Sequence, residues 1–270
     1  MTHKLNKQEV IIGIPLYKAT PSQSEFFSLE QCCKVLGKHP FTLITHKGVD
    51  LDAYRFILKQ YNIAYEVTYF HENFFSNVEG YNQLLWSPVF YKAFSEFKFL
   101  LIHQLDAFVF SDQLLHWCSK NYDYIGAPWL NAKWPNTQAI NRQLPFFTRF
   151  PFLFRLLKGK DGLVGNGGFS LRKVSTHVKY AELYANSVKT LQLNEDLFWS
   201  KYVAAKHQDF TIPLIREALS FAIENDPGNA FKMLNDTLPF GCHAWYKHDQ
   251  TDWDVIFKKA GFDPAQIPIG

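Results

Sequence analysis

Several signals that would assign this chain of 270 residues to a special class are missing from its sequence. It has no run of about 18 apolar residues, so we expect no membrane-spanning helix. The opening residues, MTHKLNKQEV, are followed by no signal-peptide hydrophobic region, and we expect no signal peptide. The net charge is only +3, which gives no support to a nucleic-acid-binding surface.

Cysteine is scarce as well. The four cysteines are Cys32, Cys33, Cys118 and Cys242, and their spacing matches neither a zinc site nor a disulfide framework. Reduced thiols are the simplest explanation, and they predict a cytoplasmic location.

The common glycine-rich phosphate loops are also missing. Residues 10–16, VIIGIPL, form a short apolar run that is typical of a first strand, but no glycine-rich sequence follows it. A Rossmann dinucleotide fingerprint and a P-loop are therefore excluded at this strand. A nucleotide bound here would be held in another way.

The residues that are present are typical of an α/β protein. Hydrophobic residues make up 47% and charged residues 20% of the chain, as in globular proteins. Alternating elements at the start predict a parallel sheet with right-handed crossovers, the nucleotide-binding half of many α/β enzymes. The expected strands are 10–16, 41–45 and 64–70, and the expected helices between them are 24–36 and 51–61.

Further elements are expected along the rest of the chain from periodicity and from the positions of proline and glycine. They are a helix over 77–97 that is interrupted near Pro88, a helix at 114–119, a strand-like run at 122–129, a helix at 173–186, a strand at 210–213, a helix or a strand over 215–224, and a helix at 253–260.

The apolar run 97–110, FKFLLIHQLDAFVF, is interrupted by polar residues that indicate a site. We expect a buried strand that ends near Gln104 and Asp106. Because ligands of open α/β sheets bind outside the carboxyl ends of the strands, Asp106 is a candidate for holding a metal ion or a sugar hydroxyl. It could also simply cap the following turn, and the sequence leaves both interpretations open.

A basic and aromatic segment lies within residues 131–160, which contain no acidic residue. Phenylalanines alternate there with arginines and lysines, most densely over 142–160. Such a segment suits contact with an anionic membrane surface, which would place the protein at the inner face of the membrane. A mobile active-site loop and a helix packed against the core are the alternatives.

Two short stretches later in the chain contain candidate site residues. The GNGG sequence at 165–168 permits a positive φ or a close approach of the backbone to a ligand, although a structural bulge would use the same residues. Asn194 is expected to cap a helix that has Glu195 and Asp196 in its first turn. Capping explains these acids without function, but a first-turn carboxylate near a cleft is also expected to stay ionised at neutral pH, as a general base must be.

A histidine near the end of the chain is the last candidate. His243 lies in PFGCHAW at 239–245, beside glycine and aromatic residues. A lone histidine is usually a hydrogen-bonded structural residue, but with Asp106 as a partner it becomes a possible metal ligand.

These stretches together resemble a bacterial and fungal family of GT-A-like glycosyltransferases. The resemblance implies a single α/β domain of the GT-A-like (Rossmann-like) class, with a mixed, mainly parallel sheet flanked by helices. Residues 1–110 would form its nucleotide-sugar-binding half and residues 111–270 its acceptor-binding half. The motifs that carry the resemblance span most of the chain and are specific as a set: YNQLLWSPVFY (81–91), QLDAFVF (104–110), YDYIGAPW (122–129), VGNGGFSLR (164–172), NEDLFWS (194–200) and PFGCHAW (239–245).

The resemblance also implies an activity and its partners. A transferase of this kind, of the hexosyltransferase type, moves a sugar from a nucleotide sugar, first of all a UDP-sugar, to a hydroxyl group of a glycan or lipid-linked acceptor. The implied role is in bacterial surface polysaccharide synthesis, and the implied mechanism is an inverting single displacement. A retaining transferase and a non-catalytic carbohydrate-binding protein are the alternatives.

Site residues follow from the resemblance in the same way. Asp196 would take the acceptor proton, and Glu195 would hold acceptor hydroxyls. Asp106 and His243 would hold a divalent cation, Mn²⁺ or Mg²⁺, at a sparse site, because Gln104 stands where GT-A enzymes usually have the first acid of Asp-x-Asp. The donor would be bound by Pro15, Tyr17, Asn82, Gln104 and Asp106, and the acceptor by Trp129, Asn166, Gly167 and Gly168.

Overall fold

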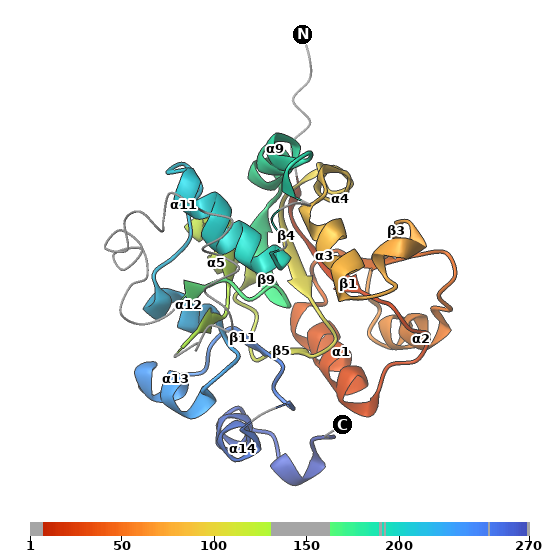
Figure 1. The fold of residues 1–270 in the computed structure, drawn as a ribbon. Coiled ribbons are helices and arrows are strands. Elements are labelled where there is room, and N and C mark those ends of the chain that lie inside the picture. Colours follow the sequence, from red (N-terminus) through yellow and green to blue (C-terminus); the bar gives the residue numbers. More distant parts are fainter. Residues whose placement is uncertain (1–7, 131–162, 189–190, 192, 248, 269–270) are drawn as a thin grey trace.

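The centre of the computed structural model is a six-stranded sheet (Figure 1). The structure describes residues 8–130, 163–188, 191, 193–247 and 249–268. Across the sheet the strands are β3 (Tyr65–Tyr69), β2 (Phe41–Thr45), β1 (Gln8–Pro15), β4 (Phe97–His103), β9 (Phe169–Lys173) and β6 (Tyr124–Gly126).

Strand directions confirm the mixed, mainly parallel sheet. The strands β3, β2, β1 and β4 run parallel to one another, whereas β9 runs antiparallel to both β4 and β6. The helices α1 (Gln23–Leu36) and α2 (Asp52–Gln60) connect the first three strands as predicted. At the start of α1, Ser22 accepts a hydrogen bond from the backbone N–H of Glu25, and the Glu25 side chain accepts one in return from the backbone N–H of Ser22.

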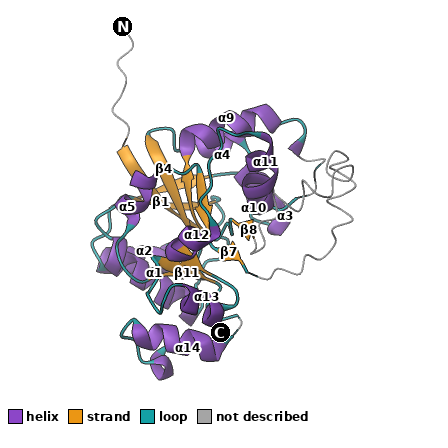
Figure 2. Ribbon diagram, turned by 90° about the vertical axis from the view of Figure 1, so that its left-hand side faces the viewer, coloured by secondary structure: helices purple, strands orange, loops and turns teal. Residues whose placement is uncertain are grey.

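Helices cover both faces of the sheet (Figure 2). Side chains that alternate along the strands form a hydrophobic core on each face. Ile12 and Leu101 belong to the core under α1, α2 and α5 (Leu114–Lys120). Ile11 and Leu100 belong to the opposite core, under α3 (Val78–Trp86), α4 (Pro88–Lys92) and α9 (Val174–Tyr184). The central domain is therefore a three-layer α/β/α sandwich.

The helices that cover the second face include one break and one π-helical segment. Pro88 begins α4 and separates it from α3, as the sequence predicts, because proline lacks the N–H that a continuing helix needs. A continuous helical stretch follows residue 194, made of α10 (Glu195–Leu197), a π-helical segment (Phe198–Val203) and α11 (Ala204–Lys206).

The run 97–110 divides into strands of two different sheets. After β4 the chain turns at Gln104–Asp106, and β5 (Ala107–Val109) joins a three-stranded sheet in the order β10-β11-β5, with β10 (Ala222–Ile223) and β11 (Gly241–His243). This sheet packs with α13 (Pro227–Met233) and α14 (Gln250–Lys259) around a third core. The polar tip between β4 and β5 therefore lies where the two sheets meet.

Residues 210–224 differ from the sequence-based expectation in part. The predicted strand at 210–213 is wrong. The backbone oxygen of Thr211 accepts from the N–H groups of Asp123 and Tyr124, but the N–H and the hydroxyl of Thr211 donate to the Asp123 side chain, so no strand ladder continues. Over 215–224 the chain forms both expected elements, α12 (Ile215–Phe221) and then β10.

The remaining described elements are short. β7 (Pro128–Trp129) and β8 (Leu163–Val164) form a two-stranded sheet, and 3-10 helices lie at Glu72–Phe74 and Pro264–Gln266. All four cysteines are buried and free. The predicted membrane-contact segment, 142–160, lies outside the described residues, and the division into a donor half and an acceptor half stays a prediction.

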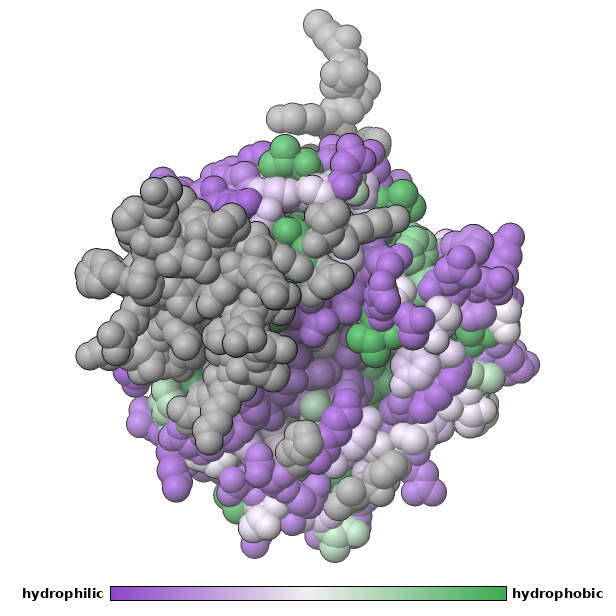
Figure 3. Space-filling view, in the orientation of Figure 1, coloured by the Kyte–Doolittle hydropathy of each residue, from purple (hydrophilic) through white to green (hydrophobic). Residues whose placement is uncertain are grey.

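Hydrophilic side chains predominate on the face of the molecule in Figure 3, with hydrophobic ones scattered among them. No helix in the described part of the chain has the length and apolar character needed to cross a bilayer.

The central position of β4 predicts a large effect of truncating its core side chains. Leu101 is fully buried, so Leu101→Ala is expected to lower the free energy of unfolding by about 2–5 kcal/mol. The matched control is Leu214→Ala, because Leu214 is 83% exposed, and its effect should stay within about 0.5 kcal/mol. Urea denaturation measures both values, and equal losses for the two variants would contradict this fold.

Candidate functional site

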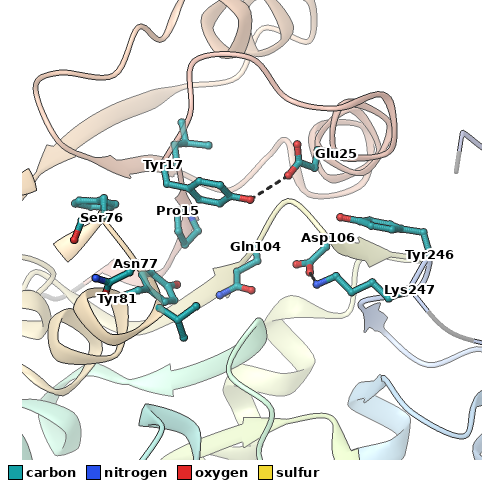
Figure 4. A pocket seen from close by; sticks show the side chains of 13 residues that line it. Pro15, Tyr17, Glu25, Ser76, Asn77, Tyr81, Gln104, Asp106, Tyr246 and Lys247 are labelled. Carbon is teal, nitrogen blue, oxygen red and sulfur yellow. Dashed lines mark hydrogen bonds and ion pairs between the residues drawn. The ribbon is translucent and has the colours of Figure 1, made fainter. Parts of the chain in front are cut away.

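A cavity of about 530 Å³ lies at the carboxyl ends of β1 and β4 (Figure 4). This volume is in the range of small-ligand sites. Pro15 and Tyr17 come from the end of β1, and Gln104 and Asp106 come from the turn after β4. Its other lining residues come from the segment after β1, from α1, from α3 and the segment that leads into it, and from the segment after β11: Leu16, Glu25, Phe75, Ser76, Asn77, Val78, Tyr81, Tyr246 and Lys247.

Four of the five predicted donor-binding residues line this cavity, and the fifth does not. Asn82 lies on α3 behind the cavity residue Tyr81, and its side-chain oxygen accepts a hydrogen bond from the backbone N–H of Glu195 at 3.0 Å. The Asn82 amide nitrogen also donates to Asn194 at 3.4 Å. Asn82 thus ties the start of α10 to the wall of the cavity, and Asn194 uses its side chain for this contact, not for a cap of its own helix.

Asp106 accepts hydrogen bonds from two basic side chains. His243 Nε2 lies 3.0 Å from Oδ1 and Lys247 Nζ lies 2.6 Å from Oδ2. Burial alone would raise the pKa of Asp106, but His243 and Lys247 outweigh it and hold this pKa well below its usual value. The carboxylate is therefore ionised, and its role is more than the capping of a turn.

His243 is held between acceptors on both sides of its ring. Its Nδ1 lies 3.0 Å from Oε1 of Glu224, and its Nε2 also lies 3.3 Å from Oε1 of Gln104. Burial lowers the pKa of His243, but Asp106 and Glu224 together raise it to about 10. At neutral pH the ring is therefore a buried cation in a row of alternating charges, Lys247, Asp106, His243 and Glu224.

The GNGG stretch packs directly against this row and against Glu195. A Cβ at Gly168 would collide with Nε2 of His243, and a Cβ at Gly167 would collide with Oε1 of Glu195. The Asn166 side chain donates to Glu224 at 2.7 Å and accepts from the backbone N–H of Gly168 at 2.8 Å. The positive φ expected in this stretch is observed at Gly165, at 131°, whereas Gly167 and Gly168 closely approach protein side chains.

Glu195 forms a buried ion pair with Arg172 of β9. Both guanidinium NH groups donate to its two carboxylate oxygens at 2.9 Å, and the Arg172 side chain is fully buried. Arg172 also donates to the hydroxyl of Tyr91 and to the backbone oxygen of Gly167. Arg172 thereby fixes the orientation of the Glu195 carboxylate, and the contact of Glu195 with acceptor hydroxyls stays a prediction.

Asp196 differs from Glu195 in having no cationic partner among the described residues. Its Oδ1 accepts a hydrogen bond from the adjacent backbone N–H of Leu197 at 2.7 Å. Burial and the neighbouring Glu195 raise the pKa of Asp196 to about 7. The expectation that this acid stays ionised at neutral pH therefore needs correction, because it is poised between its two protonation states.

The predicted acceptor residues are divided between two places. Asn166, Gly167 and Gly168 connect the Asp106–His243 side of the site with the Glu195 side. Trp129 lies in β7, which pairs with β8 just before this glycine stretch, and it is partly exposed.

The residues at the tip do not fit a divalent cation. Within the part of the chain that the structure describes, no group of three or more His, Cys, Asp or Glu side chains is arranged around a common point. Asp106 is the carboxylate of the tip, its oxygens face His243 and Lys247, and both ring nitrogens of His243 face acceptors. Mg²⁺ and Mn²⁺ at phosphate sites are usually held by one or two free carboxylates together with phosphate oxygens and water, whereas the carboxylate of Asp106 already faces two cationic side chains.

Sequence reasoning missed three residues of the site. Lys247 lies only four residues after His243, but an isolated lysine carries no motif. Glu224 follows the buried run Phe221–Ile223, which is the same signal that identified Asp106. Arg172 follows the apolar residues of VGNGGFSLR directly, and an arginine in such a buried strand could have indicated a buried ion pair.

Comparison with known proteins assigns the chain to a family. A family model described as "Protein of unknown function (DUF5672)" matches residues 64–243. The chain belongs to this family. The matched region contains Asp106, the glycine stretch, Asp196 and His243, whereas Lys247 lies beyond it. A search of the curated proteins found no match.

Three glycosyltransferases are among the solved structures similar to this DUF5672 member. Core-mannan synthase A from Aspergillus fumigatus, in its Mn/GDP form, has a TM-score of 0.50 at 10% identity over 75% of this chain and 71% of the synthase. Mouse xyloside xylosyltransferase 1 has a TM-score of 0.52 at 8% identity over 87% of this chain and 96% of the enzyme. The glycosyltransferase GlyE from Streptococcus pneumoniae has a TM-score of 0.51 at 9% identity, over 97% of this chain and 62% of GlyE. The GT-A-like fold is thereby confirmed.

The buried pair predicts a large loss of stability when one partner is removed. Arg172→Met leaves the Glu195 carboxylate buried without its cation, so it should lower the free energy of unfolding by about 3–5 kcal/mol. The control Lys98→Met breaks an exposed pair with Glu9 and should cost less than about 1 kcal/mol. Chemical denaturation measures both. Similar small losses in the two variants would show that the Arg172–Glu195 pair is not structural.

Proposed function

We propose that this chain is a glycosyltransferase that moves a hexose from a nucleotide sugar, a UDP-sugar in the first instance, to a hydroxyl group of a glycan or lipid-linked acceptor. One observation carries the proposal. The cavity lies outside the carboxyl ends of β1 and β4, where α/β sheets bind their ligands, in a fold that this chain shares with several glycosyltransferases.

The lining of the cavity supports a nucleotide-sugar donor. Tyr17, Tyr81 and Tyr246 offer aromatic surface for a base, and Asn77 and Gln104 offer amide groups for hydroxyls. In this proposal the base and ribose lie along the β1 side and the diphosphate lies at the tip after β4. The observed GT-A-like fold supports the same placement.

Asp196 is the proposed general base of an inverting single displacement. It takes the proton of the acceptor hydroxyl while that oxygen forms a bond to the anomeric carbon of the donor. The bond from this carbon to the diphosphate oxygen breaks, and its electron pair stays on the diphosphate. The pKa of about 7 supports this role, since a base near the working pH is effective.

Glu195 takes a positioning role beside the acceptor contact that the sequence suggested. Its side chain is fixed by Arg172 and its backbone N–H by Asn82. These contacts hold the first turn of α10, and hence Asp196, beside the glycine stretch that carries the proposed acceptor contacts.

We also propose that the protein acts in bacterial surface polysaccharide synthesis, with membrane contact through residues 142–160.

A donor screen tests the proposed function. One class of nucleotide sugar among UDP-, GDP-, CMP- and dTDP-sugars is expected to raise the thermal midpoint of the purified protein, because a ligand that binds only the folded state stabilises it. NMR of the product formed from that donor should show an inverted anomeric configuration. Retention of configuration would reject the single displacement. Failure of every nucleotide sugar to bind would favour a non-catalytic carbohydrate-binding protein.

The role of Asp196 predicts both a rate and a pH profile. Asp196→Asn should lower kcat by about 100- to 10,000-fold, the range of a lost general base. In the unaltered protein, activity should rise with pH through about 7, because the protonated carboxyl cannot accept the acceptor proton. Asp52→Asn is the control, since the Asp52 side chain is 82% exposed on α2. Full activity of Asp196→Asn, or a flat profile through pH 7, would reject this assignment.

A further inference from the structure

Lys247 is the one lysine or arginine among the described residues that line the cavity. Its ammonium points toward Asp106 at the tip after β4 (Figure 4). The side chain is 47% exposed, so it is open to the cavity even though it is paired. An ammonium has three N–H donors, and within the described residues only Asp106 accepts from it. The remaining donors are available for a ligand.

The position of Lys247 is fixed by the backbone as well as by the ion pair. The backbone N–H of Ala244 donates to the backbone oxygen of Asp106 at 2.9 Å, and the N–H of Lys247 donates to the oxygen of Ala244 at 3.0 Å. Ala244 itself has a φ of 53°, a left-handed conformation that an alanine adopts only at some cost. This turn returns the chain to the tip, so that Lys247 lies beside Gln104 and Asp106 in the lining.

The other charges of the cavity are already compensated. Glu25 is paired with Lys18 at 2.5 Å and accepts from the backbone N–H of Ser22. Asp106 has cations on both of its oxygens. A diphosphate that entered the cavity would therefore meet the N–H donors of Lys247 that are not bonded to Asp106, at a tip whose carboxylate already faces two cations.

We infer that Lys247 binds the diphosphate of the donor and supplies the positive charge that a divalent cation would otherwise supply. This inference rests on the proposed function and deepens it, because it names how the same site holds its donor. Asp106 acts as a positioning residue that aims the ammonium. When the bond to the anomeric carbon breaks, the negative charge that develops on the diphosphate oxygen is stabilised by the Lys247 N–H donors.

Binding measurements with and without metal test this inference. Isothermal titration with UDP, GDP, CDP and inorganic pyrophosphate is carried out in EDTA and again in manganese. The diphosphate that binds should have the same Kd in EDTA and in manganese. Lys247→Met should weaken it by about tenfold to a hundredfold, as expected for a lost charge-assisted hydrogen bond, whereas Lys247→Arg should restore most of the affinity.

Two controls separate this effect from a loss of folding. Lys92→Met removes a lysine of similar exposure, 55%, with an ion pair of the same length, 2.6 Å, that does not line the cavity, and it should leave Kd unchanged. The matching nucleoside without phosphates should bind equally to the unaltered protein and to Lys247→Met.

The outcomes distinguish the inference from the function on which it rests. A diphosphate that binds only in manganese, or that binds Lys247→Met with unchanged Kd, overturns the role of Lys247 and leaves the glycosyltransferase proposal standing. Failure of every diphosphate to bind the unaltered protein overturns both.

Discussion

The carboxylate of Asp106 joins the ends of two sheets, and the candidate site depends on this junction. Asp106 lies in the turn after β4, and its partners, His243 and Lys247, come from β11 and the turn after β11. A buried carboxylate is costly unless cations and hydrogen bonds compensate it, so the two basic side chains are held in place as firmly as the acid. Two members of this charged cluster, Asp106 and Lys247, line the cavity.

The two acids that begin α10 have very different surroundings in the same fold. Glu195 has a guanidinium on both of its oxygens, and the packing of Gly167 against it leaves no space for a larger side chain. Asp196, one residue later, has no such partner in the described part of the chain, and its pKa is raised to about 7. Neighbouring groups whose environments differ in this way are typical of sites that divide binding and proton transfer between them.

The sequence predicted most of the fold, because its apolar periodicity is strong where strands are buried. The strand predicted at 41–45 coincides with β2, and the break at Pro88 is observed. The prediction failed at 210–213, where the side chain of Asp123 replaces a strand ladder, since a contact between distant segments leaves no local pattern. The same reason explains why the residues of the site were predicted only in part. Asp106 is recognisable from its strand, whereas the role of Lys247 depends on a turn that only the folded chain brings back to the tip.

The most direct test of the central claim, that the cavity after β1 and β4 is a nucleotide-sugar donor site, is a crystal structure of the protein with the nucleoside diphosphate that binds it, grown in the presence of manganese. This account predicts the base beside Tyr17 and the diphosphate on Lys247, with no anomalous manganese signal at Asp106. A nucleotide bound elsewhere on the molecule would contradict the donor site, and a manganese ion between Asp106 and the diphosphate would contradict the role given to Lys247.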